Sequence, residues 1–139
     1  MGKEDLEKIA SAVVDAALEV HRNMGPGLLE SAYEMALCHE LSLRGIPFER
    51  QKAMNVQYKG VALDCGFRID VVAGGDVFLE LKSCEQLAPI HEAQLLNYLK
   101  LGDKRIGLLI NFNVRLLKNG LKRIVNNLEE EPVGNVTSI

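Results

Sequence analysis

The spacing of apolar residues predicts two helices at the start of the chain. In residues 4–22, apolar side chains recur every three or four positions, which is the period of an amphipathic helix. These side chains are Leu6, Ile9, Val13, Ala17 and Val20. The segment NMGPG at 23–27 ends this helix, because glycine and proline interrupt helices. A second helix is expected over about 28–44, and Gly45 follows it in the position of a left-handed C-cap.

Alternation of polar and apolar residues then predicts three strands. Residues 48–58 alternate well enough for a strand, and a turn follows at Lys59-Gly60. In LDCGFRIDVV at 63–72, the odd-numbered residues are apolar, so Leu63 through Val71 should share one face of the strand. VFLELK at 77–82 alternates again after an AGGD turn.

The rest of the chain predicts a helix, a buried strand and a small hairpin. A helix is expected over about 89–101, and the nearly all-apolar run at 105–112 is typical of a strand covered on both faces. Asn119-Gly120 predicts a hairpin between 114–117 and 121–125. The final residues, about 129–139, are expected to form a mobile tail. The whole order predicts one mixed α/β (α+β) domain over 1–139, with helices flanking a central sheet.

The turn between the second and third strands fixes their expected register. A three-residue Gly-Gly-Asp loop would pair Val71 with Leu79 and Ile69 with Leu81, whereas a two-residue loop would pair polar with apolar positions. A slip of one residue turns every side chain to the other face, so the matching apolar sets favour the three-residue loop.

The same register places Asp70 opposite Glu80 and Arg68 opposite Lys82. Opposed Cβ atoms lie roughly 4.5–5.5 Å apart, and two carboxylates at that distance bind a proton or a cation. Together with a backbone carbonyl they offer the hard oxygen ligands that suit Mg²⁺ or Mn²⁺. Lys82 points the same way as Glu80 because it lies two residues further along the strand. A solvated strand face with ion pairs across the strands remains the alternative.

Composition and charge limit the kinds of binding partner and the cell compartment that can be expected. The net charge is −3, but residues 22–128 hold 14 basic and 11 acidic side chains, which is compatible with a phosphate partner. The three widely spaced cysteines are not typical of a disulfide framework and favour a reducing compartment. Neither a signal peptide nor a membrane-spanning run is recognisable, so a cytoplasmic protein without a membrane partner is expected.

Three motifs resemble those of known nucleases. Asp70 followed by Glu80-Leu81-Lys82 resembles the D…(E)xK signature of the PD-(D/E)XK nuclease superfamily. Gln94 and Tyr98 share one helix face and resemble the QxxxY motif of its RecB-like branch. The stretch 27–33, GLLESAY, is similar to GxxExxY, the motif of a family of small bacterial and archaeal proteins in that superfamily. The expected order of helix, three-stranded antiparallel meander, helix and strand also fits the PD-(D/E)XK core.

The resemblance implies a nuclease that uses Mg²⁺ or Mn²⁺ to hydrolyse phosphodiester bonds of DNA or RNA. It implies that Asp70 and Glu80 ligate the metal ion, that the carbonyl of Leu81 adds a further ligand, and that Lys82 orients or helps to deprotonate the attacking water. Glu30 would complete the metal site, directly or through water. Alternatively, Glu30 only places a favourable charge in the first turn of its helix.

The remaining expected site residues would contact the substrate. Gln94 and Tyr98 would hydrogen-bond a phosphate or the Lys82 ammonium. Arg68 would bind a phosphate or keep Asp70 ionised. Tyr33 would hold Glu30 or touch a phosphate, with a buried core tyrosine as the alternative.

Two functions stay open from the sequence. The intact set of motif residues favours the nuclease, with nucleic acid as partner and a homodimer as the expected assembly, since small nucleases of this fold often pair. The small size and the acidic net charge favour a catalytically silent module that keeps the fold for binding or assembly.

Overall fold

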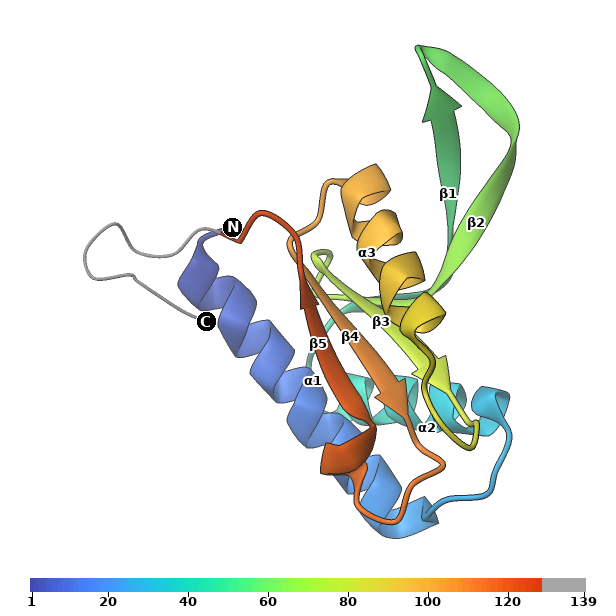
Figure 1. The fold of residues 1–139 in the computed structure, drawn as a ribbon. Coiled ribbons are helices and arrows are strands. Elements are labelled where there is room, and N and C mark those ends of the chain that lie inside the picture. The colour runs from blue at the N-terminus through green and yellow to red at the C-terminus, as the bar shows by residue number, and fades with distance from the viewer. Residues whose placement is uncertain (129–139) are drawn as a thin grey trace, which may run out of the picture.

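A computed structural model describes residues 1–128, and the tail expected over 129–139 lies outside the described residues. The helices are α1 (Lys3–Met24), α2 (Glu30–Leu43) and α3 (Pro89–Gly102), and the strands are β1 (Phe48–Tyr58), β2 (Val61–Ala73), β3 (Val77–Lys82), β4 (Ile106–Asn111) and β5 (Leu121–Val125). The strands form one sheet in the order β1-β2-β3-β4-β5 (Figure 1). Only the β3–β4 pair is parallel, because α3 carries the chain back to the end of the sheet at which β3 begins. The predicted mixed α+β fold is therefore confirmed.

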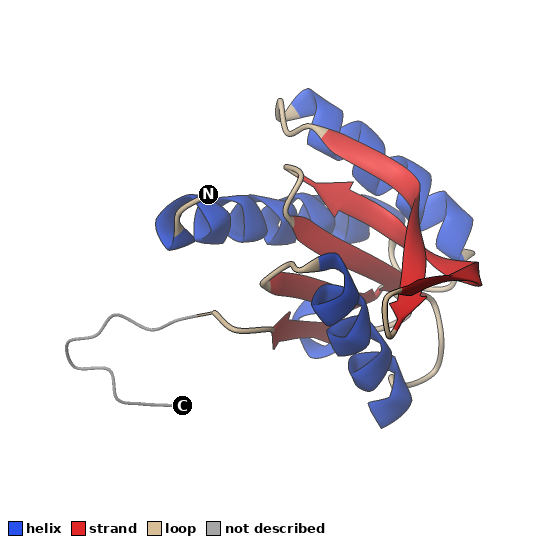
Figure 2. Ribbon diagram, turned by 90° about the horizontal axis from the view of Figure 1, so that it is seen from above, coloured by secondary structure: helices blue, strands red, loops and turns tan. Residues whose placement is uncertain are grey.

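Helices cover both faces of the twisted sheet (Figure 2). The larger core cluster lies between the sheet and the helices α1 and α2, and the smaller one lies between the sheet and α3. On β3, Leu79 faces the larger cluster and Phe78 faces the smaller one. All of β4 is buried, as the apolar run predicted, because both of its faces are covered.

The β2–β3 turn has the predicted register. Val71 pairs with Leu79, and the ladder continues to Ala73 and Val77, which leaves a three-residue loop at 74–76. Gly74 and Gly75 have φ of 60° and 77° in this loop, a conformation that favours glycine. The ladder ends at Val71 and Leu79, so the two strands separate at the next residues.

A bend in the β1–β2 pair changes which face the side chains occupy. Gln51 has a left-handed φ of 49° and lies between the pairs Arg50–Val71 and Lys52–Ile69. Val71 packs in the larger core cluster, whereas Ile69 packs under α3. The expectation that the odd residues from Leu63 to Val71 share one face is therefore wrong at this bend.

Beyond the bend, the outer part of β1 and β2 extends away from the domain as a two-stranded arm, defined here as residues 53–67 (Figure 1). Its alternating residues Tyr58, Val61 and Leu63 are apolar yet exposed, with 60% of the surface of Tyr58 and of Val61 accessible. At the base of the arm, Met54 and Phe67 join the cluster under α3.

The hairpin predicted between 114–117 and 121–125 is wrong. Leu117–Gly120 forms a short 3₁₀ helix, and β5 pairs with β4. Pairing with β4 completes the sheet and buries Leu117 against the core. Gly120 permits the close approach, since a Cβ atom there would lie 2.2 Å from the carbonyl oxygen of Asn111. Within residues 1–128, no helix is long and apolar enough to cross a membrane.

Candidate active site

The site is built where β2 and β3 separate. Asp70 directly precedes Val71, where the pairing of β2 with β3 begins, and its Oδ2 accepts a hydrogen bond from the backbone amide of Leu81 at 2.8 Å. The carboxylate thus binds a backbone donor of the neighbouring strand and lies against β3. The side chain of Leu81 itself packs in the larger core cluster.

Glu80 and Asp70 form a pair of interacting carboxyl groups. Glu80 is only 8% exposed. Burial, then the hydrogen bond with Asp70 and the charge of Asp70, together raise the pKa of Glu80 to about 9. At neutral pH the pair therefore holds a proton, as expected for two close carboxylates without a cation between them.

Lys82 is half-buried and lies on the same face of β3 as Glu80. Its positive charge acts on the pair, because it lowers the pKa of Glu80 against the larger effects of burial and Asp70. Within the described part of the chain, its ammonium group takes part in no ion pair, so it is available to a ligand of the site.

Glu30 is the first residue of α2 and lies at the end of β3. Its Oε2 accepts a hydrogen bond from the backbone amide of Ser83 at 3.4 Å, and Ser83 directly follows Lys82. Among residues 1–128, however, no three His, Cys, Asp or Glu side chains gather closely enough to hold a metal ion. Direct ligation by Glu30 together with Asp70 and Glu80 is therefore not the arrangement of this structure.

Helix α3 brings Tyr98 to the pair. The Tyr98 ring stacks on Phe67, with ring centres 4.2 Å apart and planes 7° from parallel. Burial raises the pKa of the Tyr98 hydroxyl, and the charges of Glu80 and then Asp70 raise it further, so the phenol lies in the field of both carboxyl groups. Gln94 lies one turn earlier on α3 and is exposed.

Arg68 lies apart from Lys82. It pairs with Ala53 on β1, and its Nη1 donates to the carbonyl oxygen of Gln51 at 3.0 Å. The expected opposition of Arg68 and Lys82 is wrong, because β2 pairs with β3 only from Val71 onward. The Arg68 guanidinium instead binds the backbone at the bend.

Tyr33 is buried beneath the loop between α1 and α2. Its hydroxyl donates to the carbonyl oxygen of Gly25 at 2.6 Å and accepts from the amide of Leu28 at 3.1 Å. The ring stacks on Phe112, with centres 4.5 Å apart. Tyr33 is 0% exposed, which contradicts the expected contact with a phosphate and agrees with the alternative of a core tyrosine.

Asn111 is a residue that the sequence reasoning missed. It is 1% exposed at the end of β4, beside Lys82 in the parallel ladder. Its Oδ1 accepts from the amide of Cys84 at 3.1 Å, and its Nδ2 donates to the carbonyl oxygen of Cys84 at 2.9 Å. A polar residue at the end of the apolar run GLLINF was the only signal. Asn111 fixes the chain where it leaves the site.

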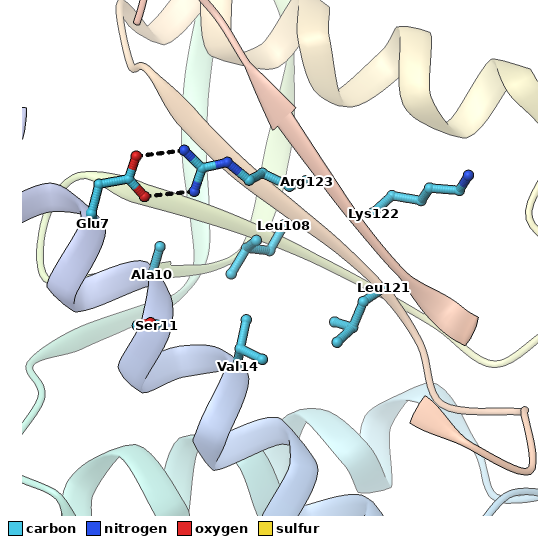
Figure 3. A pocket seen from close by; sticks show the side chains of 8 residues that line it. All are labelled: Glu7, Ala10, Ser11, Val14, Leu108, Leu121, Lys122 and Arg123. Atoms are coloured by element: carbon cyan, nitrogen blue, oxygen red, sulfur yellow. Dashed lines mark hydrogen bonds and ion pairs between the residues drawn. The ribbon is translucent and has the colours of Figure 1, made fainter. Parts of the chain in front are cut away.

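A mostly apolar groove lies away from the carboxyl pair. A cavity of about 260 Å³ separates α1 from β4 and β5, and the Glu7–Arg123 ion pair closes one end of it (Figure 3). Its lining residues are Glu7, Ala10, Ser11, Val14, Leu108, Leu121, Lys122 and Arg123. The carboxyl pair and Lys82 are not among them, so this groove is separate from the candidate site.

The donor set of the pair fits a divalent cation. Asp70 and Glu80 supply hard carboxylate oxygens, and their shared proton occupies the place that a cation would take. Among residues 1–128, two carboxyl groups meet here, so backbone carbonyl groups and water would have to complete the coordination.

The sheet order and the buried acid pair followed by a lysine define a nuclease-like α+β domain. A family model described as the PD-(D/E)XK nuclease superfamily matches residues 7–124, and the chain belongs to this superfamily. Nucleases of this superfamily typically use divalent metals, which agrees with the donor set. No curated protein matches the chain, and no solved structure matches it.

Proposed function

We propose that this protein is a divalent-metal-dependent nuclease that hydrolyses phosphodiester bonds of DNA or RNA. The observation that carries the proposal is the pair of half-buried Asp70 and buried Glu80 beside Lys82, which makes no ion pair within residues 1–128, on the fold of a nuclease superfamily. Within that superfamily, the motifs at 27–33 and 94–98 support membership of the GxxExxY family and of the RecB-like QxxxY branch.

The carboxylates of Asp70 and Glu80 would hold Mg²⁺ or Mn²⁺, with the Leu81 carbonyl as a further ligand. A bound ion would supply Lewis-acid activation of the phosphate and of a water molecule. Lys82 donates hydrogen bonds to the attacking water and offsets the charge that develops on the phosphate. Glu30 acts through a water molecule, because its carboxylate lies against Ser83 and outside the acid pair.

Three further side chains would bind the substrate backbone. The raised pKa of Tyr98 keeps its hydroxyl protonated, so it is a donor for a phosphate oxygen over the whole neutral range. Gln94, exposed one turn earlier, adds an amide donor on the same helix face. Arg68 uses one N–H group on Gln51 and has other guanidinium donors for a phosphate.

The test is cleavage of labelled single- and double-stranded DNA and RNA with Mg²⁺ or Mn²⁺. Asp70→Asn, Glu80→Gln and Lys82→Met each remove a charge or an acid–base group, and each should lower the cleavage rate by about 100-fold or more. Lys100→Met, on an exposed position of α3, is the matched control and should cleave like the wild type.

Metal binding is measured separately from cleavage. Mn²⁺ at ten to a hundred times its dissociation constant should raise the free energy of unfolding by about 1.4–2.7 kcal/mol. This rise should disappear in Asp70→Asn. A protein that cleaves none of the four substrates and gains no stability from Mn²⁺ would refute the nuclease and favour the catalytically silent module.

The arm is the surface through which a second copy would bind in the proposed homodimer. Its residues Tyr58, Val61 and Leu63 are apolar and exposed, and β1 is an edge strand. Lys59 and Asp64 are its only charged residues, so the arm neither repels another copy nor attracts a polyanion.

Sedimentation analysis tests this assembly. The wild type should sediment as a dimer, and Tyr58→Ser combined with Val61→Ser should sediment as a monomer. Leu43→Ser replaces an equally exposed apolar residue on α2 and should leave the dimer intact. A wild-type monomer at every concentration would refute the dimer without affecting the proposed chemistry.

A further inference from the structure

The loop between α1 and α2 takes a path that depends on its glycines. Gly25 and Gly27 have φ of 69° and 96°, which lie in the left-handed region. The Tyr33 hydroxyl contacts this loop twice from below, through the carbonyl oxygen of Gly25 and the amide of Leu28. The Tyr33 ring is fixed in turn by its stack on Phe112.

Ser83 contacts the same loop from the side of β3. Its Oγ donates to the carbonyl oxygen of Leu28 at 2.5 Å, and its backbone amide donates to Glu30 Oε2 at 3.4 Å. Both polar backbone groups of Leu28 are thus bound, the amide by Tyr33 and the carbonyl by Ser83. Glu30, two residues after Leu28, is held against Ser83 at the end of β3.

We infer that Tyr33 and Ser83 are positioning residues, which act through the Leu28 backbone to hold the Glu30 carboxylate at the end of β3. The inference rests on the proposed function, in which Glu30 serves the cation site through a water molecule. It assigns a physical role to each named position of GxxExxY: Gly27 shapes the loop, Glu30 carries the carboxylate, and Tyr33 fixes the loop from inside the core.

The setting of Glu30 favours a positioning role over a purely structural one. Glu30 is exposed, and together with Ser83 it lines a hollow of about 370 Å³. The hollow is also lined by Leu28, Leu29 and Ser31. A contact that served stability alone would gain little from an exposed carboxylate that accepts one long hydrogen bond. The same arrangement leaves a second carboxylate oxygen open to a ligand or a water molecule.

The test measures Mn²⁺ affinity by calorimetric titration, without any substrate. Tyr33→Phe keeps the ring stack but removes the oxygen, and Ser83→Ala removes the hydroxyl. Each should weaken Mn²⁺ binding by about tenfold, the lower end of what residues behind a metal ligand contribute. Ser83→Thr keeps a hydroxyl and should restore wild-type affinity. Ser42→Ala, at an exposed position of α2, is the matched control and should leave the affinity unchanged.

A double-variant cycle separates positioning from general destabilisation. If Tyr33 acts through Glu30, then Tyr33→Phe should weaken Mn²⁺ binding no further in a protein that already carries Glu30→Gln. Additive losses, or an unchanged affinity in both Tyr33→Phe and Ser83→Ala, would overturn the inference while the metal site itself survives.

A second measurement does not depend on the metal. Hydrogen exchange of the Ser83 amide should be faster in Glu30→Ala, which removes the acceptor, and also in Tyr33→Phe, which releases the loop that holds it. Unchanged exchange in Tyr33→Phe would overturn the inference. A wild type that fails to bind Mn²⁺ would refute the proposed metal site, and faster Ser83 exchange in both variants would still show that Tyr33 holds Glu30.

Discussion

The carboxylate of Asp70 on β2 binds the backbone amide of Leu81 on β3, with Oδ2 and N 2.8 Å apart. This contact begins where the β2–β3 ladder ends, so a side-chain oxygen takes the place of a backbone carbonyl. Because Glu80 directly precedes Leu81, the same contact brings the two carboxyl groups together. The separation of the strands is therefore what creates room for an acid pair inside the sheet.

The first prediction concerns the stability of the acid pair. Below about pH 4.5, Glu80 is protonated in both the folded and the unfolded chain. Between pH 4.5 and its folded pKa of about 9, only the folded protein retains the proton. The free energy of unfolding should therefore fall as the pH rises through this range. Glu80→Gln lacks this loss and should be more stable than the wild type by about 2–3 kcal/mol at pH 7.

Urea unfolding at several pH values checks this prediction. The difference between Glu80→Gln and the wild type should shrink toward zero as the pH falls to about 4.5. Glu85→Gln, at an exposed position in the following loop, is the control and should show no such trend. A difference that does not change with pH would mean that Glu80 ionises normally in the folded protein.

The sequence was sufficient to predict the register that brings the acid pair together. Val71 and Leu79 face one another because Gly74 and Gly75 can adopt the conformation of a three-residue turn, and only this turn matches the apolar sets. This register places Asp70 and Glu80 near one another on adjacent strands, and the hydrogen bond from the Leu81 amide to Asp70 then brings their carboxyl groups together. The roles of these residues in catalysis remain predictions.

Other parts of the site depend on tertiary contacts that alternation does not encode. Gln51 adopts a left-handed φ that its residue type does not signal, and this bend separates Arg68 from Lys82. Spacing places Tyr33 on the same helix face as Glu30. Its hydroxyl, however, donates to Gly25 and accepts from Leu28 in the loop between α1 and α2. Asn119-Gly120 is typical of a hairpin, yet the free edge of β4 takes β5 as its partner instead.

The second prediction concerns Asn111. Replacing it with alanine would leave the amide and the carbonyl of Cys84 without their buried partners. Asn111→Ala should therefore lower the free energy of unfolding by about 2–4 kcal/mol, measured by urea unfolding. Asn113→Ala is the control: only its backbone amide is bound, and alanine retains that amide, so the loss should stay below about 1 kcal/mol. Equal losses would argue against the role of the Asn111 side chain.

The third prediction concerns the ion pair that joins α1 to β5. Arg123 donates two hydrogen bonds to Glu7, at 2.7 and 2.6 Å, and this hydrogen bonding lowers the pKa of the Glu7 carboxyl (Figure 3). A lowered pKa means that the pair contributes stability above the ordinary value of 4.5 and loses it as the pH falls through the folded value.

Both side chains of this pair are more than a third exposed, so solvent screens the interaction. Glu7→Gln should therefore cost no more than about 1 kcal/mol at neutral pH, and less in high salt. Urea unfolding at low and high salt measures this cost. Glu4→Gln, on the same helix, is the control. A larger loss that persists in high salt and acid would indicate packing around Glu7 as the cause, with charge playing little part.

The last prediction separates the ring of Tyr98 from its hydroxyl. The ring stacks on Phe67 at 4.2 Å, whereas the hydroxyl lies in the field of Glu80 and Asp70. Tyr98→Phe keeps the stack, so its free energy of unfolding should stay within about 1 kcal/mol of the wild type. If the hydroxyl binds a phosphate, cleavage should nevertheless fall by about tenfold, the factor that corresponds to one hydrogen bond of about 1.4 kcal/mol.

Truncation of the whole side chain should have a different effect. Tyr98→Ala removes the stack and should lower the free energy of unfolding by about 3 kcal/mol, whereas Tyr58→Ala, on the exposed face of the arm, should cost less than about 1 kcal/mol. Cleavage kinetics and urea unfolding of the same four proteins decide the matter. A Tyr98→Phe variant that cleaves as fast as the wild type would limit Tyr98 to packing, because the ring alone would then account for its place beside the acid pair.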